Sequence, residues 1–148
     1  MSRLQGGLSR KVAELRSRIV DSLGIAVSSG YGIPEVMGPG IAYECAEGRL
    51  HVAEDHFIAE IVDPDTGQPR GYGDEGELVL TTLTREAMPI IRFRTRDVSS
   101  LNPQPCLCGR SLARMARVMH RTDDMLIIRG VNIFPSQVEA VLAEIEGV

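Results

Sequence analysis

The sequence contains no tryptophan, few aromatic residues of any kind (4%) and no long apolar run. Any buried core must therefore be built mainly from aliphatic side chains. A membrane-spanning helix needs about 20 consecutive apolar residues, so we expect no membrane partner. The N-terminal residues lack the apolar core of a secretion signal, which predicts a cytoplasmic protein. The net charge of −4 argues against a nucleic-acid partner, because surfaces that bind nucleic acid are usually basic.

Lysine and cysteine are also scarce. The one lysine is Lys11, and the cysteines are Cys45, Cys106 and Cys108. In a cytoplasmic protein, three cysteines favour free thiols or metal ligands over disulfide bonds. The remaining composition, with 43% apolar and 24% charged residues, is typical of a globular protein. A length of 148 residues suffices for one domain, or for one domain with part of a second.

Apolar residues at helical spacing predict one helix near each end. The first covers residues 9–23 and is followed by Gly24, a residue suited to end a helix. The second begins near Pro135, which a first helical turn tolerates, and a short strand at 125–128 precedes it. Because one strand and one helix cannot bury a core, we expect these residues to begin an incomplete second domain. The apolar face of the second helix comprises Val138, Val141, Leu142 and Ile145.

Between the helices, the sequence is typical of β-structure. Residues 24–29 predict a short buried strand, whereas four glycines and two prolines in residues 30–40 predict a loop. Further strand-like segments follow, separated by turns such as "DPDTG" at 63–67. We therefore expect an α+β fold. It consists of an N-terminal helix and strand, a small antiparallel β-barrel-like subdomain, and the first strand and helix of a truncated α+β domain.

Three separated motifs follow one another along the chain. They are "YGIPEVMGPG" at 31–40, "IIRFRTRD" at 90–97 and "HRTDDMLIIRGVNIFPSQVE" at 120–139. In wording, order and spacing they resemble motifs of the adenylate-forming acyl-CoA ligases, and in particular those of phenylacetate–CoA ligases. The resemblance implies that residues 1–119 form the last portion of a large N-terminal domain. It implies that residues 120–148 form the hinge and the beginning of a small C-terminal domain.

The resemblance also implies an activity. Enzymes of this family join a carboxylic acid to ATP, release diphosphate, and pass the acyl group from the adenylate to the thiol of coenzyme A. The parent enzyme is then expected to activate an aryl acid, phenylacetate by resemblance, with ATP, Mg²⁺ and coenzyme A. Its product would be phenylacetyl-CoA, as in the catabolism of phenylacetate.

The same resemblance implies a nucleotide site. Tyr31 corresponds to the aromatic residue that packs against adenine, and Gly32 keeps the backbone close to the nucleotide. Glu35 corresponds to the acid that holds Mg²⁺ on the phosphates, and Mg²⁺ prefers such oxygen ligands. Asp97 corresponds to the carboxylate that binds both ribose hydroxyls, a task that suits its two oxygens. Arg121 corresponds to a second ribose or phosphate contact.

Further positions follow from the last motif. Asp123 corresponds to the hinge about which the small domain turns, and Gly130 lies in the loop that swings toward the thioester-forming site. Two residues depart from the family pattern. Pro34 stands where Thr or Ser is usual, which removes a hydrogen-bond donor to phosphate, and His120 stands where Gly is frequent.

Two parts of the ligase machinery have no counterpart in the sequence. These are the Ser/Thr/Gly-rich phosphate loop and the catalytic lysine near the family's C-terminus. Because such groups stabilise charge on the transferring phosphate, we expect this chain to be inactive alone and assign it no catalytic residue. Two alternatives are a non-catalytic, zinc-stabilised module that binds a nucleotide or a protein, and one half of a split ligase. Exposed apolar surface is expected in each case, and a homodimer could form through it.

The cysteines and one histidine form a candidate metal site. Cys45 and His51 lie six residues apart with Gly48 between them, and Cys106 and Cys108 form a C-x-C pair. Two short pairs from distant segments are a common way to build a closed zinc site with four ligands. Thiolate and imidazole ligands favour zinc over magnesium or calcium. We therefore predict a structural Zn²⁺ bound by these three cysteines and His51.

Two alternatives to this ligand set remain open. One is that His56 binds the metal in place of His51, and the other is three reduced cysteines without a metal. In a regular strand, positions 51 and 56 face opposite ways, so both histidines cannot bind the same ion. His51 lies closer to Cys45 in the sequence and makes the tighter chelate.

Overall fold

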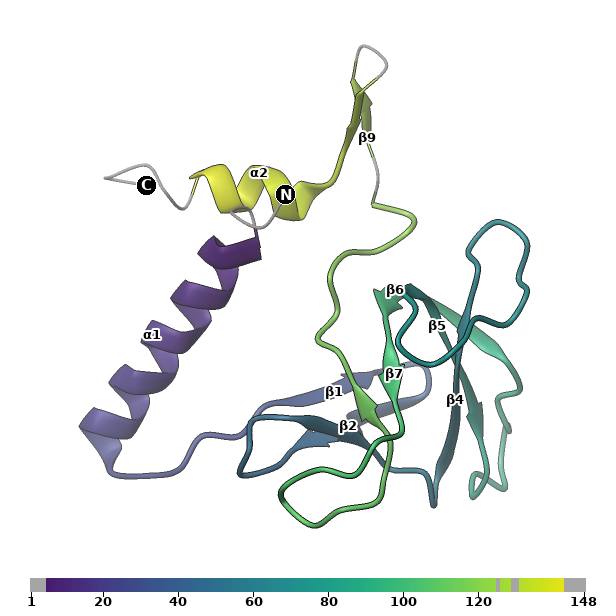
Figure 1. Ribbon diagram of the computed structural model, residues 1–148, viewed down its shortest axis with the longest axis horizontal. Coiled ribbons are helices and arrows are strands. Elements are labelled where there is room, and N and C mark those ends of the chain that lie inside the picture. The colour runs from purple at the N-terminus through teal and green to yellow at the C-terminus, as the bar shows by residue number, and fades with distance from the viewer. Residues whose placement is uncertain (1–4, 125, 129–130, 143–148) are drawn as a thin grey trace. The chain divides into compact units, whose positions relative to one another are not determined.

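The computed structural model describes the protein apart from residues 1–4, 125, 129–130 and 143–148 (Figure 1). The described residues fall into two compact units. One is Ser28–Thr122, and the other is formed by the residues that precede and follow it. No helix in the described part of the chain is both long enough and apolar enough to cross a membrane.

The first helix belongs to the unit formed by the chain ends. α1 spans Gln5–Leu23 and stops at Gly24, whose φ is +64°. The N–H of Gly24 donates a hydrogen bond to the carbonyl oxygen of Val20 at 2.8 Å. The predicted first helix and its glycine stop are therefore confirmed, although the helix begins earlier than residue 9.

The same unit contains a short hairpin and the second helix. β9 (Leu126–Ile128) and β10 (Val131–Ile133) pair antiparallel, and α2 (Pro135–Leu142) follows directly. The predicted strand and helix are confirmed, with Pro135 as the first helical residue. Of the predicted apolar face, Val138, Val141 and Leu142 are exposed, and Ile145 lies outside the described residues.

The larger unit, Ser28–Thr122, contains two antiparallel sheets. The five-stranded sheet has the order β1-β2-β3-β8-β7. Its strands are β1 (Gly30–Ile33), β2 (Met37–Glu44), β3 (Leu50–Val52), β7 (Leu101–Asn102) and β8 (Arg114–Met115). The three-stranded sheet has the order β4-β5-β6 and consists of β4 (Phe57–Val62), β5 (Gly76–Thr82) and β6 (Phe93–Ser99).

The antiparallel pairing was expected, but the barrel-like arrangement and the α+β class need correction. Both sheets are open among the described residues, and the described chain is mostly β. β7, at one edge of the five-stranded sheet, has two residues, and no strand pairing among the described residues joins this edge to the three-stranded sheet. The chain passes from one sheet to the other at Ser100, between β6 and β7.

The glycine- and proline-rich segment also differs from the prediction. Residues 24–29 form no strand, whereas the predicted loop at 30–40 contains β1 and the start of β2. Pro34 fits because it lies in the turn between these strands, where its missing N–H is not needed for pairing. Gly40 is buried with a φ of +147°, and a Cβ atom there would lie 1.7 Å from the hydroxyl oxygen of Tyr43. The strand can pass through this position because glycine has no side chain and leaves room for the Tyr43 hydroxyl.

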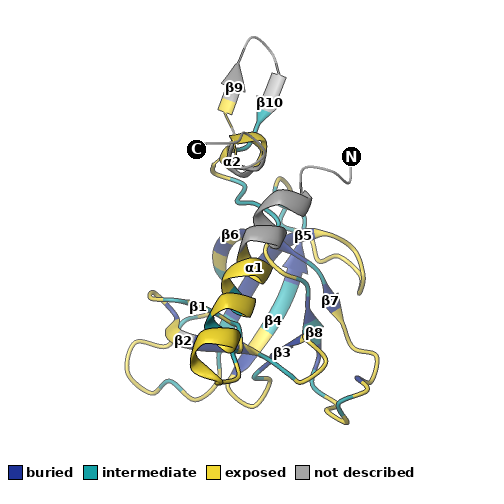
Figure 2. Ribbon diagram, turned by 90° about the vertical axis from the view of Figure 1, so that its left-hand side faces the viewer, coloured by how far each residue is buried: buried dark blue, intermediate teal, exposed yellow. Residues whose placement is uncertain are grey.

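The hydrophobic core lies between the two sheets of the larger unit, where Figure 2 shows the buried strands in dark blue. Phe57 is the one aromatic residue among the buried members of this core in the described chain, which agrees with the expected aliphatic core. Burying each such side chain contributes about 1.5–3 kcal/mol. The buried members come from β2, β3, β4, β5, β7 and β8, together with Val36: Ile41, Ala42, Leu50, Val52, Phe57, Ile61, Leu78, Leu80, Leu101 and Met115.

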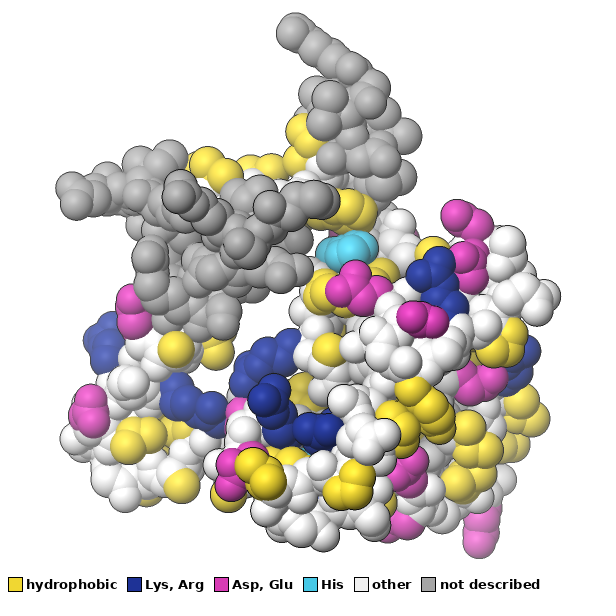
Figure 3. All heavy atoms as spheres, in the orientation of Figure 1, with side chains coloured by type: hydrophobic (Ala, Val, Ile, Leu, Met, Phe, Trp, Pro, Cys, Tyr) yellow, Lys and Arg dark blue, Asp and Glu magenta, His cyan; other side chains and the backbone are white. Residues whose placement is uncertain are grey.

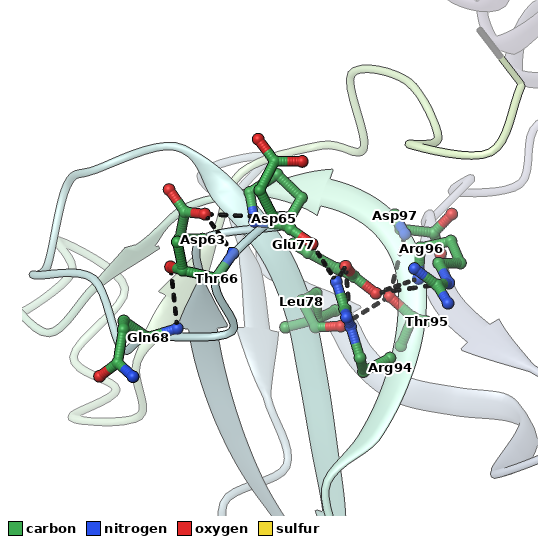
Figure 4. A network of polar contacts seen from close by, with 11 residues as sticks. Asp63, Asp65, Thr66, Gln68, Glu77, Leu78, Arg94, Thr95, Arg96 and Asp97 are labelled. Carbon is green, nitrogen blue, oxygen red and sulfur yellow. Dashed lines mark hydrogen bonds and ion pairs between the residues drawn. The ribbon is translucent and has the colours of Figure 1, made fainter.

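A polar network connects β5, β6 and the turn between β4 and β5 (Figure 4). The predicted turn at 63–67 is confirmed, because Asp63 Oδ1 accepts the backbone N–H groups of Asp65 at 3.0 Å and Thr66 at 2.8 Å. The guanidinium of Arg70 donates to Asp63 Oδ2 at 2.7 Å. The contacts from Arg70 and then from Thr66 hold the pKa of Asp63 well below its ordinary value.

Glu77 is the most deeply buried charged residue of this network. Its side chain is completely buried in β5 and accepts hydrogen bonds from the Arg94 guanidinium, including Nε at 3.1 Å, and from the Arg96 N–H at 3.1 Å. The hydrogen bond with Glu77 raises the pKa of Arg94. On the face that Figure 3 shows, acidic, basic and hydrophobic side chains all reach the surface, and several basic ones lie close together in the lower part of the view. Glu77, by contrast, is completely buried.

We expect Glu77→Gln to lower the free energy of unfolding by about 2 kcal/mol, because it weakens hydrogen bonds between a buried carboxylate and a guanidinium. Glu60→Gln is the matched control. It removes an ion pair with Arg92 (3.2 Å) in which both side chains are accessible to solvent, and such pairs contribute less than about 1 kcal/mol. Urea unfolding followed by circular dichroism measures both. Equal losses of unfolding free energy in the two variants would contradict the larger contribution expected from the buried Glu77.

Candidate nucleotide and metal sites

The carboxylate of Asp97 is positioned by an irregularity in β6. Val79 pairs with Arg94 and Glu77 with Val98, so β6 contains two more residues than β5 over this stretch. Such a bulge bends a strand and redirects its side chains. Arg96, within the bulge, has a φ of +67°, a left-handed conformation that is uncommon for residues other than glycine. The next residue, Asp97, is only 6% exposed.

Two residues from other segments donate hydrogen bonds to Asp97. The hydroxyl of Tyr31, in β1, donates to Asp97 Oδ2 at 2.6 Å. The guanidinium of Arg121 donates to Asp97 Oδ1 at 3.3 Å and to the carbonyl oxygen of Thr95 at 3.3 Å. An isolated β-bridge pairs the backbones of Asp97 and Arg121. Three of the five predicted nucleotide-binding residues, one from each motif, therefore converge.

The environment keeps the phenol of Tyr31 protonated. Burial raises its pKa most, and the hydrogen bond to Asp97 and the negative charge of that carboxylate raise it further. Thr95 and Arg121 act in the opposite direction but do not cancel this rise. Tyr31 therefore acts as a hydrogen-bond donor to Asp97 at any physiological pH.

Thr95 also supports Asp97, and motif reasoning did not identify this role. Its hydroxyl donates to the carbonyl oxygen of Leu78 at 2.8 Å and accepts the N–H of Asp97 at 3.1 Å. The side chain is buried on the core side of β6, 4% exposed. In the sequence, Thr95 and Asp97 alternate with Arg94 and Arg96, which are exposed. This alternation is the sequence signal that places Thr95 on the same side of β6 as Asp97.

The other predicted residues lie outside this cluster of contacts. Gly32 is exposed in β1, and Glu35 follows in the turn after it, with an exposed side chain and a carbonyl oxygen that accepts from Arg85 at 3.1 Å. Asp123 is exposed and lies directly after the end of the larger unit. Gly130, predicted in a moving loop, lies outside the described residues.

The predicted metal ligands come together from three places: the turn between β2 and β3, strand β3 itself, and the loop between β7 and β8. Ligand atoms of Cys45, His51, Cys106 and Cys108 all lie within 4.8 Å of one another. The sulfurs of Cys45 and Cys106 are 4.0 Å apart, and the sulfur of Cys108 is 3.5 Å from His51 Nε2. His56 lies elsewhere, with its Nδ1 2.9 Å from the Thr84 hydroxyl oxygen. The structure therefore groups His51, and not His56, with the cysteines.

His51 is held so that one ring nitrogen faces the cysteines. It is 2% exposed, and its Nδ1 lies 3.0 Å from the carbonyl oxygen of Leu112. Because a carbonyl oxygen can only accept, Nδ1 must carry the proton in this hydrogen bond. Nε2 of a neutral ring is then unprotonated and available to bind a metal. A hydrogen bond of this kind is the usual support for a metal-binding histidine.

The thiols differ in acidity. Partial removal from water raises the pKa of Cys45, but hydrogen bonds from the backbone N–H groups of Arg49 and Glu47, together with the neighbouring His51 and Cys108 side chains, outweigh this effect and lower it to about 6. The backbone N–H of Arg110 lowers the pKa of Cys108, yet desolvation and the neighbouring thiols raise it on balance. Cys45 is therefore largely a thiolate at neutral pH, which is the form that binds metals.

The two cysteine turns share one pattern, C-x-x-G-R, at Cys45–Arg49 and Cys106–Arg110. In each turn the cysteine N–H donates to the arginine carbonyl oxygen (2.9 and 3.4 Å), and the glycine N–H donates to the cysteine carbonyl oxygen (2.9 and 3.0 Å). Gly48 and Gly109 have φ values of +69° and +84°. Equivalent turns thus bring cysteine sulfurs from distant segments together, one from the first turn (Cys45) and two from the second (Cys106 and Cys108). This repeat is a signal in the sequence that motif reasoning overlooked.

We expect Tyr31→Phe to change how stability depends on pH. Because the pKa of Tyr31 is raised in the folded state, the unfolded chain loses this proton first as the pH rises. The resulting stability is fully present below about pH 10 and is lost as the pH rises toward the folded-state pKa. Urea unfolding at a series of alkaline pH values should therefore give a steeper loss for the wild type than for Tyr31→Phe. Identical slopes in the two proteins would count against this contact.

Comparison with known proteins adds sequence relatives. No protein-family model matches the chain. The phenylacetate–coenzyme A ligase of Thermus thermophilus is 51% identical over 133 residues, and that of Escherichia coli is 50% identical over 134 residues. These alignments cover 88% and 89% of this chain but only 30% of each relative. The chain thus spans less than a third of the length of the curated relatives that it matches.

Solved structures share the fold of this segment. A 2-hydroxyisobutyryl-CoA ligase in the postadenylation state, in complex with 2-HIB-AMP, matches with a TM-score of 0.74 at 28% identity, over 92% of this chain and 29% of that one. The O-succinylbenzoate coenzyme A synthetase of Bacillus subtilis matches in fold, with a TM-score of 0.53 at 21% identity over 88% of this chain and 30% of that one. The chain is therefore homologous to phenylacetate–coenzyme A ligases over about 30% of their length and has the fold of that segment of an adenylate-forming ligase.

Proposed function

We propose that the chain is part of an ATP-dependent ligase. The reaction converts phenylacetate, ATP and coenzyme A into phenylacetyl-CoA, AMP and diphosphate through an acyl-adenylate. The observation that carries this proposal is the convergence of Tyr31 and Arg121 on the buried carboxylate of Asp97. Identity of about 50% to phenylacetate–coenzyme A ligases supports the choice of acid. The proposed location is the cytoplasm.

In this proposal Asp97 binds the ribose of the nucleotide. An ionised carboxylate has about four lone-pair sites, of which Tyr31 and Arg121 each use one. The two remaining sites are suited to accept the two ribose hydroxyls. The ring of Tyr31 lies against adenine, and Arg121 contacts the ribose or a phosphate.

The turn after β1 faces the phosphates in this arrangement. Gly32 keeps the backbone close to the nucleotide, and the exposed carboxylate of Glu35 would hold Mg²⁺, which binds through one or two carboxylates and phosphate oxygens. Pro34 cannot donate a hydrogen bond to phosphate, so this contact must come from another group. Mg²⁺ would supply positive charge against the phosphates.

The end of the larger unit supports the position of the proposed hinge, whereas the same division groups residues 1–27 with 123–148 and not with the larger unit. The larger unit ends at Thr122, and Asp123 is the first residue beyond it. We assign residues 1–119 to the last portion of the N-terminal domain, and 120–148 to the hinge and the beginning of the C-terminal domain that delivers coenzyme A. The phosphate loop and the catalytic lysine are then contributions of other parts of the ligase. The chain alone is expected to form no acyl-adenylate.

A chimeric enzyme tests this function directly. We expect phenylacetyl-CoA formation when this chain replaces the matching 30% of the Escherichia coli ligase. Asp97→Asn in the chimera should lower kcat/KM by about 30-fold, because charged hydrogen bonds to the ribose contribute about 2 kcal/mol. A coupled enzyme assay of AMP release measures the ligase activity of the chimera. Comparing phenylacetate with an aliphatic acid in this assay measures its preference between the two acids.

Asp65→Asn is the control for this experiment. Asp65 is exposed in the turn between β4 and β5, so this variant should keep the activity of the unaltered chimera. A folded chimera without ligase activity would contradict the proposed function. An active chimera that is insensitive to Asp97→Asn would instead contradict the ribose role.

We also propose a structural Zn²⁺ bound by Cys45, His51, Cys106 and Cys108. A tetrahedral zinc with Zn–S distances of about 2.3 Å holds its ligand atoms roughly 3.8 Å apart. The sulfur–nitrogen separation of 3.5 Å and the sulfur–sulfur separation of 4.0 Å are close to this value, and all four ligand atoms lie within 4.8 Å of one another. Four protein ligands leave no open position for substrate, so the ion would stabilise the fold and take no part in the chemistry.

Elemental analysis of protein purified without a histidine tag should find about one zinc per chain, the content of a single four-ligand site. Cys45→Ser and Cys106→Ser should each abolish zinc binding, because the ligands come from two distant turns. His56→Ala is the control and should retain zinc, since His56 contacts Thr84 and not the cysteines. Absence of zinc from the wild type, or its retention by Cys45→Ser, would refute this site.

A further inference from the structure

The loop between β7 and β8 has little to hold it apart from the cysteine cluster. Among residues 103–112, all of which the structure describes, Cys106 is the only buried one. Leu107 is 93% exposed. A loop of this length with one buried side chain has few apolar contacts to offset the entropy of its closure. Its fixed conformation therefore depends on the group of atoms around Cys106.

The end of this loop is attached to β3 through the same histidine that faces the cysteines. The ring of His51 donates through Nδ1 to the carbonyl oxygen of Leu112 and presents Nε2 to the cysteine sulfurs. The next residue, Ala113, donates its N–H to Glu54 Oε2 at 2.7 Å, and its carbonyl oxygen accepts from Val52 at 2.9 Å. A metal bound at Nε2 would thus fix both the ring and the loop end.

β8 follows directly and has two residues. Met115 is 5% exposed and pairs with Leu50 of β3 on one side and Leu101 of β7 on the other. A strand this short forms too few hydrogen bonds to keep its register unaided. Its position between β3 and β7 therefore depends on the residues at its two ends.

After β8 the backbone runs along β6 as far as the nucleotide residues. The N–H of Ala116 donates to Ser100 at 2.9 Å, that of Met119 to Val98 at 3.0 Å, and that of Thr122 to Arg96 at 2.7 Å, in each case to the carbonyl oxygen. Arg121 directly precedes Thr122, and its guanidinium donates to Asp97. One continuous segment therefore leads from the cysteine loop to the proposed ribose site.

We propose that the zinc ion fastens the loop 103–112 to β3 and thereby holds β8 and residues 116–122 in register, so that Arg121 meets Asp97. The inference rests on the zinc proposed above, not on the ligase reaction. The two C-x-x-G-R turns supply cysteine ligands to this ion, one from the β2–β3 hairpin and one from the loop. The ion contacts no nucleotide and acts only by positioning this segment. Metal binding energy then contributes to local folding stability.

Hydrogen exchange measured by mass spectrometry, with and without zinc removal by a chelator, tests this proposal. We expect exchange in residues 103–122 to accelerate by roughly tenfold or more on zinc removal, because local opening becomes easier. Exchange in β5, which lies in the other sheet, should change by less than about twofold and serves as the internal reference. Zinc loss with unchanged exchange in 103–122 would overturn the proposal. So would equal acceleration in β5, since it signifies unfolding of the whole unit.

Two variants at one position keep the test sharp. Cys108→Ser should release zinc and reproduce the fast exchange of the chelated protein. Cys108→His restores a fourth ligand and should recover both zinc and slow exchange, which a role in packing alone would not produce. Fast exchange in a zinc-loaded Cys108→His protein would overturn the proposal, as would a wild type that binds no zinc. Activity of the chimeric ligase is a separate result that neither outcome decides.

Discussion

A buried carboxylate must be paired, and this requirement organises the larger unit around Asp97. An uncompensated charge on a side chain that is only 9% exposed would cost several kcal/mol. Tyr31 and Arg121 supply the two donors, and they come from the first strand and from the last residues of the unit. The contact thus connects β1, β6 and the segment after β8 at one carboxylate. The same atoms can accept the hydroxyls of a ribose, so the structural and the proposed functional demands on Asp97 coincide.

The cysteine cluster meets a different requirement, which is to hold the loop between β7 and β8 against the five-stranded sheet. With few aromatic residues and strands as short as two residues, the sheet has little apolar area with which to secure the loop before β8. His51 links the cluster to this loop because its two ring nitrogens serve separate partners. A single metal ion can replace the packing that the composition does not provide.

Buried polar groups also connect the three-stranded sheet. Glu77 accepts from Arg94 and from the backbone of Arg96, and the latter lies in the bulge that redirects Asp97. The hydrogen bonds of Glu77 and Thr95 therefore fix the backbone on both sides of the bulge. These groups bind no ligand in the proposed site, but the position of the ribose carboxylate depends on them.

The amino-acid sequence alone determined both helices, the turn at 63–67 and the identity of the motifs. These features depend on residues that are close in sequence: helical spacing, Gly24 as a stop, Pro135 at a first turn, and the Asp63 side chain on its own backbone. The sequence also indicated Cys45, His51, Cys106 and Cys108 as one group, because their spacing and chemistry are local properties. It could not indicate that Leu112 fixes the ring of His51.

Only the tertiary structure decided where Gly- and Pro-rich residues form strands and which side chains meet. Gly40 lies in β2 because the Tyr43 hydroxyl occupies the place of a side chain, a contact that propensity does not encode. The two open sheets in place of a barrel reflect which strands pair, and strand pairing joins residues that are distant in the sequence. Tyr31 and Asp97 are 66 residues apart in the sequence, and their hydrogen bond exists because β1 and β6 share one core. Packing between distant segments determines such contacts, and local sequence patterns do not predict it.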